Sequence, residues 1–117
     1  MIKMEPGKQR VIEIMKKVSF KLNSSETDTI TKGIQMYLVI SPVNSLDWKA
    51  QVLRTYQLYE SKFRKTTFMN KKHFKFNLNM SEASTLNTVL NNIEARAGIY
   101  ESVTINKVLE IINKQTI

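Results

Sequence analysis

The chain has 117 residues, of which 42% are hydrophobic, a size and composition that suit one domain with a single modest core. Its 18 Lys and Arg residues outnumber 10 Asp and Glu residues, and the resulting formal net charge of +8 favours a polyanionic partner such as nucleic acid or an anionic membrane surface. Because there is no cysteine and only one histidine, disulfides, thiolate metal sites and histidine clusters are excluded, and no cofactor is expected.

The N-terminal segment 1–16 does not predict one structure. Its residues GKQRVIEIMKK fit a short amphipathic helix, a strand extension or a basic arm that reaches along nucleic acid. The first ten residues lack the apolar core of a signal peptide, and no apolar run approaches the ~18 residues that a membrane span needs. We therefore expect a cytoplasmic protein that does not bind a membrane.

Two segments, 17–23 and 73–79, alternate strictly between apolar and polar residues, which predicts two half-buried strands. The side chains expected to face inward are Val18, Phe20 and Leu22 in the first strand and Phe74, Phe76 and Leu78 in the second. The side chains expected to face outward are Ser19, Lys21 and Asn23, and His73, Lys75, Asn77 and Asn79.

These segments belong to an internal repeat with an offset of 56 residues. SFKLNSSETDT at 19–29 and KFNLNMSEAST at 75–85 are identical at six of eleven positions. In both copies the period of the apolar residues changes from 2 to 3.6 after the strand, and Ser25 and Ser81 are the predicted N-caps of the following helices. In the second copy, a helix is predicted over 81–96, with one apolar stripe formed by Leu86, Val89, Leu90 and Ile93. The counterparts of these residues in the first copy are Ile30, Gly33, Ile34 and Tyr37.

A second helix is predicted in each copy after the loops at 39–45 and 96–102, with Ser45 and Ser102 suited to cap it. In the first copy this helix is expected to run to about Phe63 and to be followed by a basic linker at 64–72. The predicted core positions are Ile105, Val108, Leu109 and Ile112, and the counterparts at the offset of 56 are Lys49, Val52, Leu53 and Tyr56.

A single copy cannot bury its apolar stripes or pair its strand, whereas two copies can do both around one shared core. We therefore expect a mainly α fold with a short two-stranded antiparallel β-ribbon, in which repeats 17–63 and 73–117 form one compact domain.

KFNLN leading into SEASTLNTVLNNIE and then ESVTINKVLEII resembles the ribbon-helix-helix family of DNA-binding proteins, the Arc and MetJ repressor type. That family usually pairs two identical chains, whereas here both halves lie in one chain, similar to the tandem arrangement of some accessory proteins of plasmid conjugation. The resemblance implies a monomer that acts as an intramolecular pseudo-dimer on double-stranded DNA, and it leaves further self-association on DNA open. The first half departs from the family pattern at Pro42, at Lys49 and in its longer second helix.

The resemblance also implies which residues contact DNA. A two-stranded ribbon fits the major groove, and the outward side chains, in this sequence Ser19, Lys21, Asn23, Lys75, Asn77 and Asn79, would read base edges. The resemblance also implies phosphate contacts at the starts of the second helices. Further contacts are expected in the basic segment before the second strand, because of its charge and its position beside the ribbon. The candidates are Ser45, Ser102, Thr104, Lys71 and Lys72.

Other readings of the sequence remain open. A protein-interaction module, antitoxin-like or scaffold-like, would use exposed apolar residues of the long first-half helix, and a helix-turn-helix protein would require that 17–23 and 73–79 are not strands. An enzyme is not expected, because the chain has no nucleophile, acid and base set and no glycine-rich phosphate loop. The expected role is sequence-specific DNA binding, as a transcriptional repressor or as an accessory factor of a plasmid, phage or conjugative element.

Overall fold

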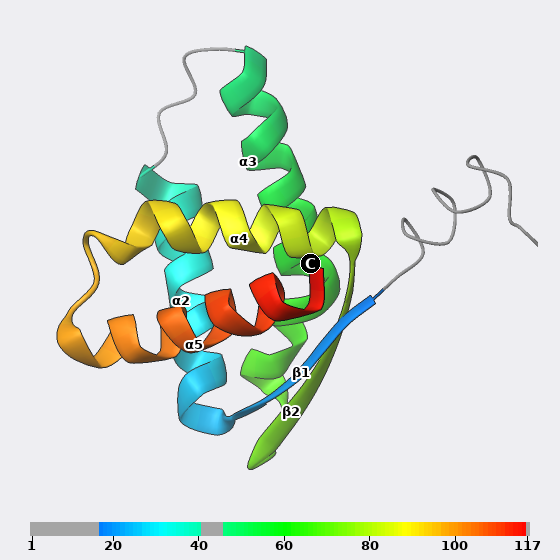
Figure 1. Ribbon diagram of the computed structural model, residues 1–117, viewed down its shortest axis with the longest axis vertical. Coiled ribbons are helices and arrows are strands. Elements are labelled where there is room, and N and C mark those ends of the chain that lie inside the picture. The colour runs from blue at the N-terminus through cyan, green and yellow to red at the C-terminus, as the bar shows by residue number, and fades with distance from the viewer. Residues whose placement is uncertain (1–16, 41–45, 117) are drawn as a thin grey trace, which may run out of the picture.

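The computed structural model describes residues 17–40 and 46–116 of the chain (Figure 1). The expected mainly helical fold with a two-stranded antiparallel ribbon is confirmed. The expected elements of segment 1–16 lie outside the described residues. In chain order, the elements are β1 (Lys17–Asn23), α2 (Ser24–Ile40), α3 (Leu46–Leu58), the π-helical turn η1 (Tyr59–Phe63), the 3-10 turn η2 (Arg64–Phe68), β2 (His73–Asn79), α4 (Met80–Glu94) and α5 (Ile99–Thr116).

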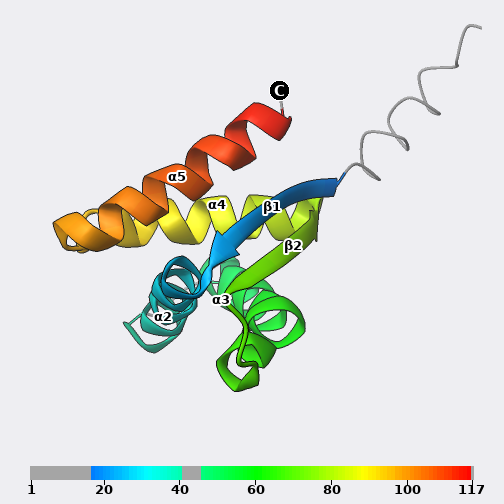
Figure 2. The same cartoon turned by 90° about the horizontal axis from the view of Figure 1, so that it is seen from below.

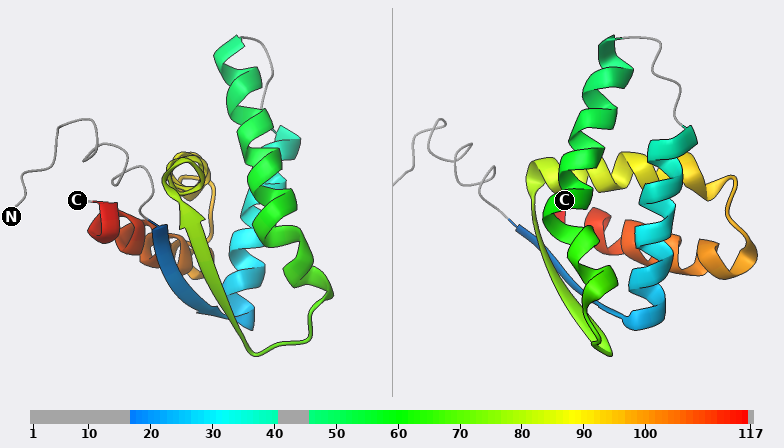
Figure 3. Two further views of the ribbon diagram at one scale, coloured as in Figure 1. Left: turned by 90° about the vertical axis from the view of Figure 1, so that its right-hand side faces the viewer. Right: turned by 180° about the vertical axis from the view of Figure 1, so that it is seen from behind.

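The ribbon pairs β1 with β2 so that Phe20 lies directly opposite Phe76, its counterpart in the repeat. Their rings stack with centroids 5.3 Å apart, and Phe63 stacks on Phe76 at 4.9 Å. Exposed and buried residues alternate along both strands, as the sequence predicts. Figure 3 shows α5 on one side of the ribbon and α3 on the other. Both strands contact α2 and α4, and their apolar side chains are buried.

The same cap begins both helices that follow the strands. Asn79 Oδ1 accepts the Glu82 N–H at 2.8 Å, and Glu82 Oε1 accepts the Asn79 N–H at 3.0 Å. Asn23 and Glu26 repeat this arrangement at 2.8 and 3.0 Å. Each pair is a capping box, which satisfies two backbone donors that a helix start would otherwise leave unpaired.

The predicted caps Ser25 and Ser81 are therefore wrong by two residues. The last residue of each strand is already extended, with φ −73° and ψ 173° at Asn79, and asparagine caps a helix as well as serine does. Ser25 and Ser81 instead lie within the first turns, where their carbonyls accept hydrogen bonds from the hydroxyls of Thr29 and Thr85.

The shared core contains most of the predicted apolar stripes. All four predicted positions of α4 and all four of α5 are buried, as are Ile30, Ile34 and Tyr37 of α2. Gly33 interrupts the α2 stripe for a steric reason, because a Cβ at this position would lie 2.6 Å from Ile93 Cδ1. The glycine thus allows α2 and α4 to pack closely.

The register predicted for α3 is wrong. Leu53 and Tyr56 are 57% and 52% exposed, Lys49 is also exposed, and Thr55 and Leu58 are buried instead. α5 begins at Ile99 and α3 at Leu46, which is 53 residues apart rather than 56. With 3.6 residues in each turn, three residues fall about 60° short of a full turn, so the stripe predicted from the offset of 56 is rotated away from the buried face of α3.

Helical structure continues beyond the predicted end of the first repeat at Phe63. The π-turn η1 and the 3-10 turn η2 carry the chain to Phe68, so half of the expected linker is helical and buries Thr66. The remaining residues 69–72 lead into β2, and the carbonyl of Lys72 accepts the Ser24 N–H at 2.9 Å. Over residues 17–40 and 46–116, no helix is both long enough and apolar enough for a bilayer span.

Candidate nucleic-acid interface

The exposed face of the ribbon collects all six predicted base-reading residues. They alternate with the buried residues on both strands, and the antiparallel register pairs them across the ribbon. Two further residues complete the face, because the alternation extends to Lys17 and His73, one at the start of each strand. The facing pairs are Lys17 with Asn79, Ser19 with Asn77, Lys21 with Lys75, and Asn23 with His73.

The middle of this face is polar and positively charged. Ser19 Oγ donates a hydrogen bond to Asn77 Oδ1 at 2.6 Å. Lys21 lies directly opposite Lys75, and like charges at facing positions of a ribbon destabilise the pairing. The eight residues include no carboxylate that could relieve this repulsion. An anionic partner placed on the face would relieve it.

The two terminal asparagines carry a structural role that sequence analysis missed. The Oδ1 atoms of Asn23 and Asn79 each accept a helix N–H, so only the amide N–H groups of these exposed residues are left as donors. Bidentate pairing with adenine needs the oxygen and the nitrogen of the same amide. Asn77 does not cap a helix, and its Oδ1 accepts only the Ser19 hydroxyl, a side-chain donor that can rotate away, whereas the backbone donors at Asn23 and Asn79 are fixed. Asn77 is therefore the ribbon asparagine best placed for that contact.

One carboxylate next to the ribbon is neutralised within the protein. Lys107 of α5 donates to Glu26 Oε2 at 2.6 Å, and this bond, followed by the Asn23 N–H, holds the pKa of Glu26 below its usual value. The corresponding Glu82 accepts a 3.4 Å hydrogen bond from Ser61 of η1. Lys107 thus offsets the negative charge of Glu26 beside an otherwise basic face.

Of the predicted phosphate contacts at the helix starts, Ser102 and Thr104 lie on α5 away from the ribbon face. Ser45 lies outside the described residues. Ser102 is not a cap, because α5 begins at Ile99 and the Ser102 N–H already bonds to the Gly98 carbonyl at 2.9 Å. Thr104 lies further inside the helix. The turn before α5 lies away from the ribbon in Figures 1 and 2, whereas the C-terminal end of α5 lies beside β1.

Lys71 and Lys72 are exposed in the loop that leads into β2, close to the ribbon, as their place in the sequence suggests. Their contact with phosphate stays a prediction.

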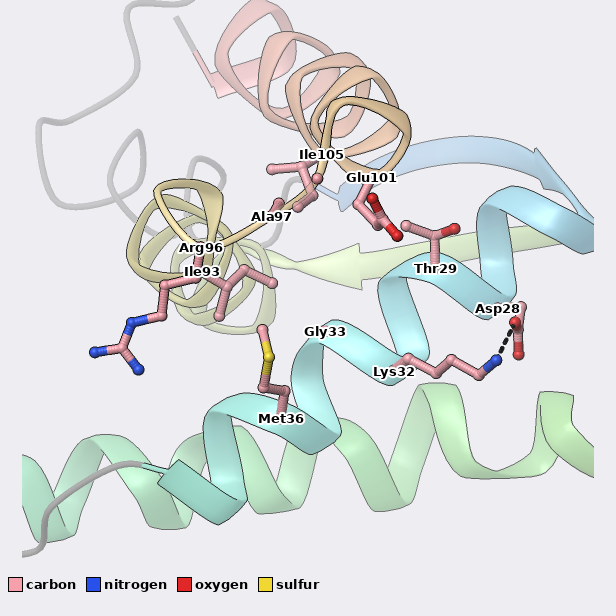
Figure 4. Close-up of a pocket in the computed structure, with 11 residues that line it drawn as sticks. Asp28, Thr29, Lys32, Gly33, Met36, Ile93, Arg96, Ala97, Glu101 and Ile105 are labelled. Carbon is pink, nitrogen blue, oxygen red and sulfur yellow. Dashed lines mark ion pairs between the residues drawn. The ribbon is translucent and has the colours of Figure 1, made fainter.

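A pocket of about 330 Å³ lies between α2, the end of α4 and the start of α5 (Figure 4). It surrounds the close approach at Gly33. Its rim carries Asp28 paired with Lys32 at 2.9 Å, together with Arg96 and Glu101. Positive and negative side chains are balanced here, so this pocket offers no field of one sign to a charged ligand.

Compared with protein-family models, curated proteins and solved structures, the chain shows no match. Its class and function rest on its own sequence pattern and geometry.

Proposed function

We propose that this chain is a tandem ribbon-helix-helix protein that binds double-stranded DNA as a single-chain pseudo-dimer. The observation that carries the proposal is the ribbon itself. Phe20 and Phe76, equivalent residues of the repeat, face each other at its centre, with three paired positions on either side. A two-fold relation between the halves requires such a central pair. On the opposite face the same register places the polar and basic side chains outward.

Contacts between the halves support the pseudo-dimer. Each capping-box glutamate accepts a hydrogen bond from the region of the second helix of the other half, Glu26 from Lys107 and Glu82 from Ser61. α2 packs against α4, and α3 and α5 each pack against the first helix of the opposite half. Such exchanged contacts are expected of two interlocked protomers rather than of two separate subdomains.

The exposed face suits readout in the major groove. This groove admits a two-stranded ribbon, and lysine can donate to guanine, asparagine can pair with adenine, and serine can address either. Ser19, Lys21, Lys75 and Asn77 form the centre of the face. Asn23 and Asn79 at its ends would contribute single amide donors, because their oxygens cap helices.

The DNA site should be an imperfect palindrome. The two strands present Ser, Lys and Asn against Lys, Asn and Asn at equivalent positions, so the two half-sites are read by different side chains. The biological role would be that of a transcriptional repressor or of an accessory factor at a plasmid, phage or conjugative element. Both roles need sequence-specific binding without chemistry on the DNA.

Salt-dependent mobility shift tests this proposal. Affinity for a preferred duplex should fall linearly with salt on logarithmic axes, because phosphate contacts release counterions. A double variant that replaces Lys21 and Lys75 by Gln should lose most of its preference for that duplex. The control replaces Lys32 and Lys49, exposed on α2 and α3, by Gln, which changes the net charge equally and should keep the preference. Absence of duplex binding by the folded wild-type protein at low salt would contradict the proposal.

A second candidate function follows from the apolar residues exposed on α3. Leu53 and Tyr56 line an open pocket of about 400 Å³ with Leu38, Lys49 and Val52. Exposed apolar patches of this kind mark sites of protein interaction. Under this alternative, Leu53→Asp would abolish binding of a protein partner at high salt, and Lys21→Gln would leave that binding intact. Under the leading proposal, Leu53→Asp leaves the affinity of the protein for isolated duplexes unchanged.

A further inference from the structure

The two outer edges of the ribbon differ in what lies against them. On the β1 edge, the side-chain amide of Gln115 accepts the Ser19 N–H at 2.9 Å and donates to the Ser19 carbonyl at 2.7 Å. This single glutamine from the end of α5 therefore pairs the middle of the β1 edge as a neighbouring strand would. Figure 2 shows the C-terminal end of α5 beside β1.

On the β2 edge the structure forms a pocket of about 200 Å³ instead. It lies between β2 and the η1–η2 segment, and we call it the lysine pocket. Four lysines from four different segments line it: Lys62 from η1, Lys65 from η2, Lys71 from the following loop, and Lys75 from β2. Asn77, at the centre of the proposed reading face, also lines the pocket.

The lysine pocket carries positive charge only, as far as the described residues show. Among the described residues that line it, none is Asp or Glu. In residues 17–40 and 46–116, the ion pairs formed by lysine use Lys32, Lys107 and Lys114, none of which lines this pocket. Holding several ammonium groups around one cavity is unfavourable unless an anion is shared between them.

A π-turn and a 3-10 turn form one wall of the pocket. α3 is followed by a π-turn and a 3-10 turn, with Phe63 buried against Phe76, and these turns bring Lys62 and Lys65 to the β2 edge. A π-turn within a helix is rare and frequently lies at a functional site. α5, the matching helix of the other half, continues without such a turn to Thr116.

We propose that the lysine pocket binds one phosphate group of the DNA backbone beside the half-site read by β2, and that this contact fixes the orientation of the protein on its site. The proposal rests on the proposed DNA-binding function. Lysine ammonium groups recognise phosphate as point charges, and the pocket adjoins Asn77, so it lies at the rim of the ribbon where backbone flanks the groove. On the β1 edge, the side-chain amide of Gln115 occupies the backbone groups of Ser19 instead.

Ethylation interference on an asymmetric binding site tests the orientation. Ethylation of a phosphate beside the half-site read by β2 should block wild-type binding, and the mirror-related phosphate in the other half-site should not matter. The double variant Lys62→Gln, Lys65→Gln should lose this interference signal while other signals remain. Equal interference at both half-sites, or an unchanged signal in the variant, would overturn the proposal.

The salt slope provides a quantitative readout. Log affinity falls with log salt, and loss of one phosphate contact should make this slope shallower by about 0.9 on every duplex. The matched control is Lys32→Gln, Lys49→Gln, which changes the net charge equally on α2 and α3 and should change the slope by less. Equal changes in the two variants would contradict a specific contact.

Lysine-modification footprinting on the unmodified sequence keeps the proposal testable if the variant does not fold. Specific duplex should protect Lys62 and Lys65 from acylation and leave Lys49 reactive, and unprotected Lys62 and Lys65 in the complex would overturn the proposal. The same footprinting with inorganic phosphate in place of DNA distinguishes a site for a DNA phosphate from a site for free phosphate. Protection by millimolar phosphate without protection by duplex would show that the pocket takes a free phosphate, which overturns the DNA contact. Failure of the wild-type protein to bind any duplex would instead refute the proposed function.

Discussion

Lys21 and Lys75 face each other across the exposed side of the ribbon, each on the central part of its strand. Facing like charges oppose strand pairing, and opposite or neutral pairs at the same position would favour it. The ribbon therefore keeps a pair that its own stability does not favour. Binding of an anionic surface accounts for this pair, whereas a merely solvent-exposed face does not require it.

The first prediction separates stability from binding at this pair. Lys21→Thr should stabilise the free protein by a few tenths to about 1 kcal/mol, because it removes the repulsion and introduces a residue that favours strands. The same change should weaken DNA binding. Urea denaturation and mobility shift measure the two effects. Lower stability together with unchanged DNA binding would contradict the assigned role of Lys21.

The second prediction concerns sequence preference. Asn77→Ala should reduce discrimination between the preferred duplex and one with a changed base pair by about 1–3 kcal/mol, the range for a bidentate base contact. Asn106→Ala, on the exposed face of α5, is the control and should change nothing. Competition binding with matched duplexes measures the difference. Equal loss of affinity for specific and random DNA would sink the base-reading role of Asn77.

The third prediction tests the corrected helix caps. Asn79→Ala should destabilise the protein by about 0.5–2 kcal/mol, because the Glu82 N–H at the start of α4 loses its acceptor. Ser81→Ala should change stability much less, since its side chain is not the cap. Thermal unfolding of both variants without DNA gives the comparison. A larger loss at Ser81 than at Asn79 would argue against the capping box.

The fourth prediction concerns pH and the Lys107–Glu26 pair. The folded-state pKa of Glu26 lies below the usual 4.5, so its contribution to stability is present above about pH 4.5 and is lost as pH falls through the lower, folded-state value. Lys107→Met should therefore destabilise the protein at pH 7 by about 1 kcal/mol or less, and the difference from wild type should shrink in acid.

Urea titrations at pH 7 and at several acidic values measure this difference. Lys114→Met is the control, because it breaks an exposed pair with Glu110. A difference between wild type and the Lys107 variant that stays constant from neutral to acidic pH would show that the pair does not act through Glu26 ionisation.

The fifth prediction tests the close approach of α2 and α4. Gly33→Ala gains up to about 1 kcal/mol in helix propensity, but its Cβ would meet Ile93 Cδ1 at 2.6 Å, so overpacking should produce a net loss of stability. Adding Ile93→Val removes that δ-methyl group and should recover part of the loss. A double-mutant cycle in urea measures the coupling, and strictly additive effects would argue against this contact.

Local patterns in the sequence predict the parts of the fold that depend on nearby residues. The alternation at 17–23 and 73–79 correctly predicts the strands and their buried faces, and the stripes of α4 and α5 are correct because each lies within one uninterrupted helix. The α3 register is wrong because it depends on the connection after α2, which differs in length from its counterpart. Residue type alone does not distinguish a capping asparagine from one that reads a base.

The lysine pocket could not be predicted in this way. Lys62 and Lys75 are 13 positions apart, and they line one cavity because η1 and η2 pack beside β2, with Phe63 stacked on Phe76. No sequence pattern used for helices and strands signals these turns. The excess of lysine in 61–81 is visible in the sequence, but its arrangement around a pocket depends on tertiary packing.

Selection from random duplexes, combined with the mass of the selected complex, tests the central claim most directly. A single-chain pseudo-dimer with two different reading strands predicts an enriched imperfect palindrome and a complex with one chain for each site. A perfect palindrome occupied by two chains, or no enriched sequence at all, would contradict it.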